Sequence, residues 1–403
     1  MRKILVIHHS NDLGGGTLSC FDVINALKET ADYNITLALP NCKGSAYNSA
    51  KKLKIRVIES PPSLVFSYYN GSSSLLKASI KVMNRYRYLS KWRKFFEKEK
   101  PDLVILNSMV QWPLISMLKK LNIKNVCFVR ETMRGNSNTP INKIIKRNLL
   151  NATGISFLSN FDKNQWNLPA ILNQTVIPDS VNIQLFNNGI SKENSRNNLS
   201  LKEDTFYILY VGGMSKLKGA DILIKAMKNI QVEKVELLFV GDLGGNLISD
   251  QHRLKNYSRI KFVNKVNKYV EVNNLRTKIR FVGLQDEMNS WYAACDVVVF
   301  PTKKAHQARP IYEAGVFEKP VIVSDFPNFY EYLIPGKSGL VFKPGCYNEL
   351  ASNIQALHGN ESLCAYLGKN NYLLTMKYHN SQDVNKKVKV FVESILKDGE
   401  QNA

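Results

Sequence analysis

Two short segments in the second half of the chain carry residues suited to binding a phosphorylated ligand. The first runs from Val211 through Gly212, Gly213 and Lys218 to Gly219, and the second from Arg309 through Pro310, Ile311 and Glu313 to Gly315. In each, an apolar stretch gives way to a predicted helix, whose first turn presents unpaired backbone N–H groups and the positive end of the helix dipole. Anions bind at such ends. With a lysine for phosphate and a glutamate for sugar hydroxyls, these segments predict a site for a nucleotide diphosphate.

Each of the charged residues in these segments also has a simpler explanation. Lys218 is explained as a solvated first-turn lysine, although a cation at a helix N-terminus is unfavourable unless an anion lies nearby. Glu313 is expected in the first turn that Pro310 opens, where its charge would compensate the helix dipole without any ligand. Arg309 directly precedes that helix and is placed to face phosphate or carboxylate. His306, on the same loop, is more typical of a surface residue.

A third glycine-rich segment lies near the N-terminus. An apolar strand ends at His8, and Gly14-Gly15-Gly16 then opens a helix, so that Gly15 and Gly16 would let the backbone approach a ligand closely. As a dinucleotide fingerprint it is poor, because Ser19 stands where the third glycine belongs. A tight turn without a ligand is the alternative explanation.

The elements that position these segments are predicted to be parallel strands alternating with helices. The strands are nearly continuous apolar runs, as expected when helices cover both faces of a sheet. In the first half they are predicted at 3–8, 34–39, 55–58, 103–106, 125–129, 154–157 and 175–177. In the second half they are predicted at 206–211, 235–240, 279–282, 297–300 and 321–323. Ligands of such sheets bind beyond the carboxyl ends of the strands.

The chain length of 403 residues fits two domains. We predict an N-terminal Rossmann-like domain over residues 1–186, a polar linker over 187–203 and a second domain over 204–379. A C-terminal helix over 380–398, with an apolar stripe at Val384, Val388, Phe391 and Ile395, is expected to pack back on the first domain. The fold class is thus α/β, with two doubly wound parallel-sheet domains facing a central cleft.

The charge of the chain is strongly positive and unevenly spread. The formal net charge is +22, and residues 1–200 hold 28 Lys and Arg against 12 Asp and Glu. The excess peaks at residues 77–100, where nine basic residues meet two acidic ones among aromatic side chains. This segment predicts either docking on anionic lipid with some aromatic insertion, or a solvated helix whose aromatics pack into the domain. No nucleic-acid recognition motif is present, so no specific nucleic-acid partner is expected.

Neither a secretory signal nor a transmembrane run is recognisable in the sequence. The apolar stretch after Arg2 and Lys3 is too short for a signal peptide and ends in His8-His9. No stretch of 18 apolar residues exists. We therefore expect a cytoplasmic protein, peripheral at the inner face of the cell membrane. No Cys/His cluster has metal-ligand spacing, so no metal site is predicted.

The chain resembles the GT-B glycosyltransferases of the large retaining family 4, and the match is strongest from Val176 to Leu350. Val211 to Gly219 is similar to the family pattern V-G-R-L-x3-K-G, and Glu313-Ala314 with Lys319-Pro320-Val321 resembles the segment around the second family glutamate. This resemblance implies that Lys218 binds the donor diphosphate and Glu313 the ribose hydroxyls. It also implies retention of the anomeric configuration.

Three positions depart from the family pattern. Gly213 stands where the family has arginine, and Arg309 is expected to replace that cation. Ala305 stands where the first glutamate of the E-x7-E pattern contacts the donor sugar, which puts the donor preference in question. Arg130-Glu131 follows a first-domain strand where many members carry histidine, so we expect Arg130 and Glu131 to contact donor or acceptor at the catalytic centre.

The sequence as a whole predicts a glycosyltransferase that moves a sugar from a UDP- or GDP-linked donor to a glycan or lipid-linked acceptor. No cofactor is expected, and the absence of a DxD motif together with Lys218 favours metal-independent stabilisation of the leaving group. Bacterial surface polysaccharide synthesis is the expected pathway. A nucleotide-sugar epimerase of the same fold, a dehydrogenase and a non-catalytic binding or scaffold protein are the alternatives. The dehydrogenase is disfavoured by the broken glycine fingerprint.

Overall fold

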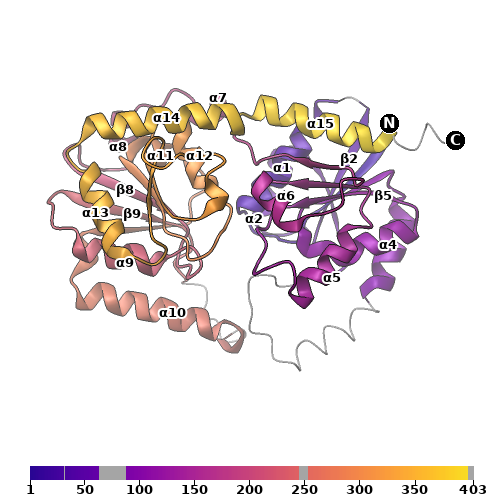
Figure 1. Ribbon diagram of the computed structural model, residues 1–403, viewed down its shortest axis with the longest axis horizontal. Helices are drawn as coiled ribbons and strands as arrows, with labels where there is room; N and C mark the ends of the chain where they lie inside the picture. The colour runs from indigo at the N-terminus through magenta and orange to yellow at the C-terminus, as the bar shows by residue number, and fades with distance from the viewer. Residues whose placement is uncertain (31, 63–87, 245–252, 398–403) are drawn as a thin grey trace. The chain divides into compact units, whose positions relative to one another are not determined.

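The protein forms two compact units, each built on a parallel β-sheet. The computed structural model describes residues 1–30, 32–62, 88–244 and 253–397. One unit contains residues 1–180 together with the C-terminal residues from 381, and the other contains residues 181–380 (Figure 1). The predicted fold class, two α/β units with parallel sheets, is confirmed.

The sheet of the first unit has seven strands among the described residues, in the order β3-β2-β1-β4-β5-β6-β7. All neighbouring strands pair in parallel. Their bounds are β1 Arg2–Ile7, β2 Tyr33–Leu39, β3 Arg56–Glu59, β4 Leu103–Leu106, β5 Lys124–Val129, β6 Gly154–Phe157 and β7 Gln174–Val176. Each of the seven strands predicted in the first half is present, to within one or two residues at its ends.

Helices cover both faces of this sheet, as its apolar strands require. Along β1, Ile4 and Val6 face one core and Leu5 and Ile7 the other, because successive side chains of a strand point to opposite faces. The helices on the first face are α1 Gly15–Lys28, α2 Ser45–Lys52 and α15 Ser381–Lys397. The second face carries η1 Met109–Leu114, α4 Ile115–Lys120, α5 Pro140–Leu149 and α6 Asn160–Trp166.

The C-terminal helix α15 is part of the first unit. Its predicted apolar stripe is buried, with Val384, Val388, Phe391 and Ile395 each at most 5% exposed and packed with α1. The Lys124 ammonium donates hydrogen bonds to the carbonyls of Ile395 at 3.0 Å and Leu396 at 2.7 Å. A lysine at a helix C-terminus satisfies carbonyls that have no partner within the helix. The contact is close enough that a Cβ at Gly154 would lie 2.6 Å from the Ile395 side chain.

The second unit has a six-stranded parallel sheet among the described residues, in the order β10-β9-β8-β11-β12-β13. The strands are β8 Phe206–Val211, β9 Val235–Val240, β10 Ile279–Gly283, β11 Val297–Phe300, β12 Val321–Ser324 and β13 Leu340–Phe342. The five predicted strands are present. The edge strand β13 was not predicted, because it has three residues of which only Phe342 is fully buried.

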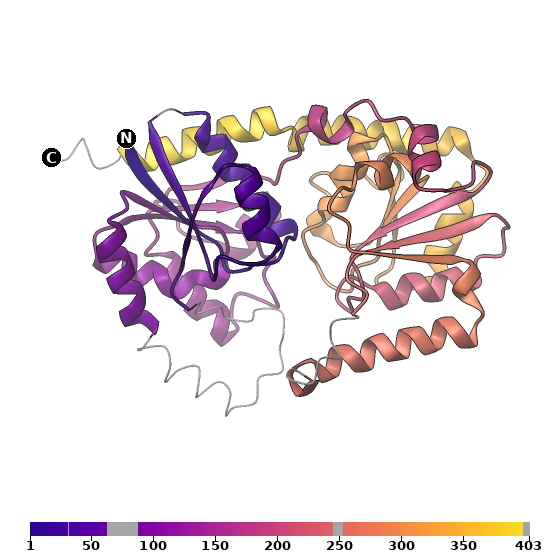
Figure 2. The ribbon, with the colours of Figure 1, turned by 180° about the vertical axis from the view of Figure 1, so that it is seen from behind.

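Helices cover both faces of the second sheet as well. One face carries α9 Ala220–Asn229, α10 Arg253–Val272, η4 Leu275–Thr277 and α13 Tyr347–Leu357. Figure 2 shows α10 running alongside α9. The other helices of this unit are α7 Ile183–Asn187, α8 Lys192–Asn198, α11 Asn289–Ala294, α12 Arg309–Val316, η5 Pro327–Phe329 and α14 Glu361–His379.

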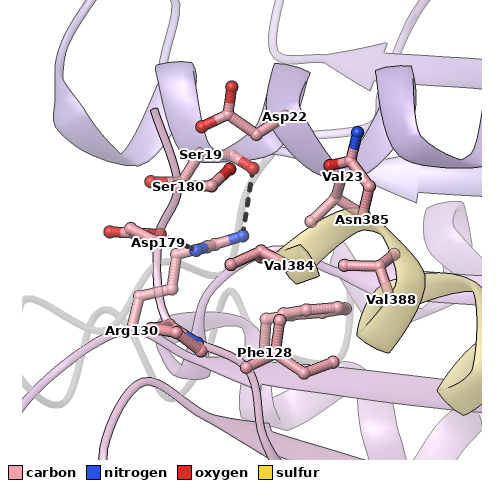
Figure 3. A pocket seen from close by; sticks show the side chains of 12 residues that line it. Ser19, Asp22, Val23, Phe128, Arg130, Asp179, Ser180, Val384, Asn385 and Val388 are labelled. Atoms are coloured by element: carbon pink, nitrogen blue, oxygen red, sulfur yellow. Dashed lines mark hydrogen bonds and ion pairs between the residues drawn. The ribbon is translucent and has the colours of Figure 1, made fainter. Parts of the chain in front are cut away.

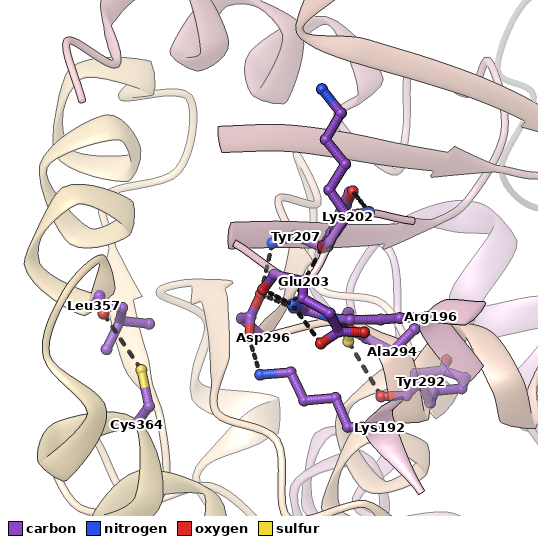
Figure 4. A network of polar contacts seen from close by, with 11 residues as sticks. Lys192, Arg196, Lys202, Glu203, Tyr207, Tyr292, Ala294, Asp296, Leu357 and Cys364 are labelled. Carbon is purple, nitrogen blue, oxygen red and sulfur yellow. Dashed lines mark hydrogen bonds and ion pairs between the residues drawn. The ribbon is translucent and has the colours of Figure 1, made fainter. Parts of the chain in front are cut away.

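Residues 187–203 do not form the polar linker that the sequence predicts. They contain α8 and lie inside the second unit, where Arg196 is 2% exposed. Its guanidinium donates to Asp296 at 2.8 Å and to the carbonyl of Ala294 at 3.1 Å, and Asp296 also accepts from the Tyr207 amide at 2.7 Å (Figure 4). The buried Arg196, together with Lys192, whose ammonium also pairs with Asp296 at 2.6 Å, therefore fixes α8 to the sheet, a role that polar composition does not reveal.

The basic segment 77–100 is described only in part. Residues 77–87 lie outside the described residues, and 88–99 are helical. Trp92 and Phe96 are each 1% exposed in the core of the first unit, and the Trp92 indole donates to the Pro62 carbonyl at 3.1 Å. Insertion of these two aromatic side chains into lipid is therefore wrong. The described ranges contain no helix long and apolar enough to cross a membrane.

Candidate functional site

The loop after β8 is a tight turn that only glycine fits. Gly213 has φ +60°, and a Cβ there would lie 2.6 Å from the carbonyl oxygen of Asp242. Gly219, which precedes α9, has φ +75°, and a Cβ there would lie 1.7 Å from the Pro301 carbonyl oxygen. The loops after β8, β9 and β11 are therefore in contact at the carboxyl edge of the sheet. An arginine at position 213 would clash with this backbone, so the family arginine would require a different turn here.

The amides of this turn are already paired. Gly212 and Gly213 both donate to the Val240 carbonyl at 3.0 Å. Because both amides are already engaged, this geometry does not favour the predicted role of the two glycines as amide donors to a ligand. Their role here is to shape the turn.

Lys218 lies at the end of this turn, and its ammonium has no hydrogen-bond or ion-pair partner within the described ranges of the chain. Only its backbone is engaged, since its amide donates to Ser215 at 3.3 Å and its carbonyl accepts from the Tyr210 hydroxyl at 3.5 Å. Burial lowers the pKa of Lys218, and the nearby Glu313 carboxylate partly opposes that shift. Lys218 is half-buried, and a cation that is partly removed from water without a paired side chain is unfavourable, so this position is suited to an anionic ligand.

Glu313 is held from two sides. Its Oε2 accepts from the Tyr292 hydroxyl at 2.7 Å, and its Oε1 accepts from Arg309 Nε at 3.1 Å. The residue is 8% exposed. Burial, and then the Glu313 charge, raise the pKa of Tyr292, so its hydroxyl stays protonated as the donor. A carboxylate has about four acceptor positions, so Glu313 keeps capacity for further hydroxyl donors.

The expected place of Glu313 in the first helical turn is wrong. Helix α12 begins at Arg309, so Glu313 is its fifth residue, and the first turn has no acidic side chain. Compensation of the helix dipole, which acts mainly within the first turn, therefore does not explain this glutamate.

The other predicted residues of this segment serve packing or pairing. Arg309 forms the ion pair with Glu313 and lies over the Tyr312 ring. Pro310 and Ile311 are buried, and the Ile311 amide donates to the Ala308 carbonyl at 3.1 Å. No side-chain contact with a ligand is available to Ile311, which is 1% exposed.

His306 is half-buried and in contact with neighbouring side chains, which differs from the surface residue that the sequence predicts. Its ring stacks on Phe300 with 6.3 Å between the ring centroids, and its carbonyl accepts from the Asn328 side chain at 3.1 Å. Burial, and then the positive charge of Lys218, lower the pKa of His306 to about 4. The imidazole of His306 is therefore neutral and lies near Lys218. The sequence signal for this residue was its position on the same loop as Ala305 and Arg309.

In the first unit, Arg130 is fully engaged within the protein. Its Nη1 pairs with Asp179 at 2.5 Å and its Nη2 donates to the Ser19 carbonyl at 3.2 Å (Figure 3). Its Nε donates to Asn107 Oδ1 at 2.9 Å. The side chain is 9% exposed. Arg130 therefore holds together the segments that carry its partners. The sequence does not predict Asp179 and Asn107 as those partners.

Glu131 is likewise satisfied by neighbouring groups. Its carboxylate accepts hydrogen bonds from the Ser108 hydroxyl, from the Met109 amide at 3.1 Å and from the Arg130 amide at 3.1 Å. Burial raises the pKa of Glu131, and these hydrogen bonds partly oppose that shift. Because Met109 begins η1, Glu131 caps that helical turn.

The glycines near the N-terminus lie over a buried histidine. Gly14 precedes α1 without a side-chain cap, and the Gly15 and Gly16 amides donate to no other described residue. His8 accepts from Asn107 at its Nδ1, 3.1 Å away, and donates from Nε2 to Thr17 at 3.0 Å, because the Thr17 hydroxyl itself donates to Asp12. Burial lowers the pKa of His8 to about 3, so it is neutral.

No group of three or more His, Cys, Asp or Glu side chains is placed to hold a metal ion in the part of the chain that the structure describes.

Sequence comparisons relate the second unit to known glycosyltransferases. Residues 191–374 match the family model described as Glycosyl transferases group 1. An uncharacterized glycosyltransferase of Methanocaldococcus jannaschii is 30% identical over 193 residues, which cover 47% of this chain and 48% of that protein. The capsular polysaccharide biosynthesis glycosyltransferase CapM of Staphylococcus aureus is 26% identical over 219 residues, which cover 54% and 52%. The chain thus spans about half the length of these curated relatives.

Solved structures resemble the chain along its whole length. Anabaena HepE in complex with UDP-glucose has a TM-score of 0.78 at 18% identity, covering 98% of this chain and 100% of that one. Sucrose-phosphate synthase from Thermosynechococcus elongatus has a TM-score of 0.76 at 19% identity, covering 98% and 99%. The chain therefore has the GT-B fold, and its residues 191–374 are similar to the family described as Glycosyl transferases group 1.

Proposed function

We propose that the protein is a glycosyltransferase that takes its sugar from a nucleotide diphosphate donor bound at the carboxyl edge of the second sheet. In this proposal the Lys218 ammonium holds the diphosphate and Glu313 accepts hydrogen bonds from the ribose hydroxyls. The observation that carries it is the half-buried ammonium of Lys218, which has no side-chain partner among the described residues, near the Glu313 carboxylate. The glycosyl transferases group 1 match covers both residues and supports it.

In the proposed reaction, the bond between C1 of the sugar and the diphosphate oxygen breaks while the oxygen of an acceptor hydroxyl bonds to C1 and the hydroxyl proton passes to the departing diphosphate. Negative charge develops on the departing diphosphate, and Lys218 is preorganised to stabilise it without a metal or a further cofactor. The paired Arg309 holds Glu313 in position rather than competing for the ribose. Assignment to family 4 and retention of the anomeric configuration follow from the resemblance of the motifs and belong to this proposal.

Arg130 and Glu131 have a different part in this proposal. Their hydrogen bonds all go to residues of the first unit, so we assign them as positioning residues for the loops at the carboxyl edge of the first sheet. The exposed Gly15 and Gly16 amides at the start of α1 are the ligand contacts proposed for this unit.

The acceptor that we propose is a lipid-linked or other glycan hydroxyl presented at the inner face of the cell membrane. The strongly basic first half of the chain favours an anionic environment, and the name of the CapM relative supports a role in surface polysaccharide synthesis. The donor nucleotide is tested first as UDP, since UDP and UDP-glucose occur in complexes of the Anabaena structural relative.

The test is a thermal-unfolding screen of the purified protein with UDP, GDP and ADP, followed by their sugars. A ligand that binds only the folded state adds about 2.7 kcal/mol of stability at 100 times its dissociation constant. We expect one nucleotide to stabilise the wild type and Lys216→Ala, whose side chain is exposed on the same loop, but not Lys218→Ala. Equal stabilisation of both variants would remove the site assignment, and release of an altered sugar without acceptor would indicate an epimerase.

A further inference from the structure

The helices α4 and α5 of the first unit carry an unusually one-sided charge. Between residues 103 and 161 the chain has eight Lys and Arg but one acidic residue, Glu131, whose carboxylate is engaged by its neighbours. Five of these cations lie on the two helices, and in the described ranges none of the five forms an ion pair: Lys119, Lys120, Lys143, Lys146 and Arg147. This positive charge is therefore not neutralised by acidic side chains of the described chain.

The two helices form one surface, which we call the α4–α5 face. Ser116 donates to Asn148 at 2.7 Å and Lys119 donates to Asn151 at 3.0 Å, and the two helices lie side by side in Figures 1 and 2. These hydrogen bonds fix the basic end of α4 against α5.

The outward side of α5 mixes cations with an aliphatic side chain. Asn142, Ile145 and Leu149 face the core, whereas Lys143, Ile144 and Arg147 follow at helical spacing on the opposite side and are exposed. Ile144 is 48% exposed, and Leu150 at the end of the helix is 39% exposed. Exposed aliphatic groups between lysine and arginine side chains are the pattern of helices that lie in the interface of an anionic bilayer.

We propose that the α4–α5 face docks the protein on an anionic lipid bilayer. Each basic side chain near such a surface contributes attraction, and Ile144 would enter the boundary between headgroups and acyl chains. A nucleic acid would satisfy the charge but not the exposed aliphatic side chains. This inference rests on the proposed function for its purpose, because it would bring the enzyme to a lipid-linked acceptor, and it places docking on α5 rather than on residues 77–100.

Helix α10 of the other unit offers a matched control surface. Lys261 and Lys265 are exposed one helical turn apart with the polar Asn264 exposed between them, whereas the exposed apolar side chains of this helix, Tyr257 at 65% and Val272 at 71%, lie toward its two ends. A pair of charge reversals at Lys261 and Lys265 therefore changes the net charge of the protein as much as a pair on α5, at cations that flank a polar residue rather than an aliphatic one.

The experiment is cosedimentation of the full chain with vesicles of phosphatidylcholine, with and without one quarter phosphatidylglycerol. We expect wild-type binding only to the anionic vesicles, lost at high salt. The double variant Lys143→Glu, Arg147→Glu should bind at least about tenfold more weakly, and Lys261→Glu, Lys265→Glu less than about threefold. Equal losses in the two pairs, unchanged binding of the α5 pair, or wild-type binding that ignores lipid charge would overturn the proposal.

Two further measurements separate this proposal from its alternatives. Ile144→Ser should weaken binding about threefold while leaving its salt dependence unchanged, whereas no loss would contradict interfacial insertion. Thermal unfolding with UDP checks that each variant is folded, with Lys143→Gln, Arg147→Gln as the milder pair if the reversals unfold the chain. Absence of nucleotide binding in every protein would count against the proposed function alone, and vesicle binding would still decide the docking surface.

Discussion

Two enclosed cations at the carboxyl edges of the two sheets have opposite surroundings. Arg130 in the first unit is paired with Asp179 and donates to Asn107 and the Ser19 carbonyl. Lys218 in the second unit has no side-chain partner among the described residues, and burial lowers its pKa. An internal charge needs compensation from the protein or from a ligand. The first cation is therefore part of the architecture, and the second has the surroundings of a binding group.

The glutamates of the two units repeat this contrast. Glu131 accepts three hydrogen bonds, two of them from the backbone amides of Met109, the first residue of η1, and Arg130. Glu313 accepts two side-chain hydrogen bonds and keeps open acceptor capacity. The residue type is the same in both units, so the partners of each carboxylate distinguish a positioning glutamate from a binding one.

The largest effect is expected from Lys218→Ala. Removing one preorganised donor to a developing anion typically costs about 100- to 1,000-fold in rate. Stability without ligand should stay unchanged or rise, because the variant removes an unpaired internal charge. Sugar transfer or donor hydrolysis and urea unfolding are measured on the same preparation, with Lys216→Ala as the exposed control. A loss of stability comparable to that of Arg130→Ala would break the contrast between the two cations.

Arg130→Ala should act on stability instead. Removing one partner of a buried ion pair leaves the other uncompensated and costs about 3–5 kcal/mol, and here Asp179 is 11% exposed. Arg130→Lys should recover only part of that loss, because an ammonium cannot make the three-directional contacts of the guanidinium. Urea unfolding of both variants gives the values. If Arg130→Ala kept full stability but lost sugar transfer, Arg130 would have the catalytic role that its sequence position predicts.

The sequence was sufficient for what depends on local pattern. Continuous apolar runs such as Phe206–Val211 identified the central strands, and the glycines around Lys218 identified the turn. It was not sufficient for partners distant in the chain. Asp179 is 49 residues from Arg130, and Tyr292 is 21 residues from Glu313. Such pairs depend on the topology that brings loops together, which no local pattern specifies.

Helix boundaries and burial of single polar residues were the other limits. Helix α12 starts one residue earlier than Pro310 suggests, which moves Glu313 out of the first turn. Arg196 lies in a polar stretch yet is 2% exposed, because Asp296 and carbonyl groups compensate its charge. Composition averages over such residues, so it predicted a linker where a paired cation is buried. His306 differs in its physical reason, because the ring is held neutral rather than paired with a counter-charge.

Gly213→Ala should have an intermediate effect. Its positive φ disfavours any side chain, and the added Cβ meets the Asp242 backbone, so a loss of about 2–4 kcal/mol is expected from strain and overpacking together. The matched control is Gly345→Ala, where φ is +87° but nothing lies within 4 Å of the added Cβ. In urea unfolding the control variant should lose about 1–2 kcal/mol of stability, which is the cost of the backbone conformation alone. Equal losses would mean that the Gly213 turn does not contact the loop after β9.

The smallest expected effect is on the pH dependence of stability, and it tests how strongly the Lys218 charge lowers the pKa of His306. The pKa of His306 is lowered to about 4, whereas an unfolded histidine titrates near its ordinary value of 6.5. The unfolded state therefore binds more protons between these values, so stability falls as pH drops from about 7 to 5, by about 1–2 kcal/mol for this group. His306→Gln should reduce that pH dependence by the same amount. Lys218→Ala should reduce it by less, because burial is the larger cause of the shift and the lysine charge the smaller. Urea midpoints at both pH values decide this, and a pH dependence identical in wild type and His306→Gln would mean that the ring is not held neutral beside the lysine.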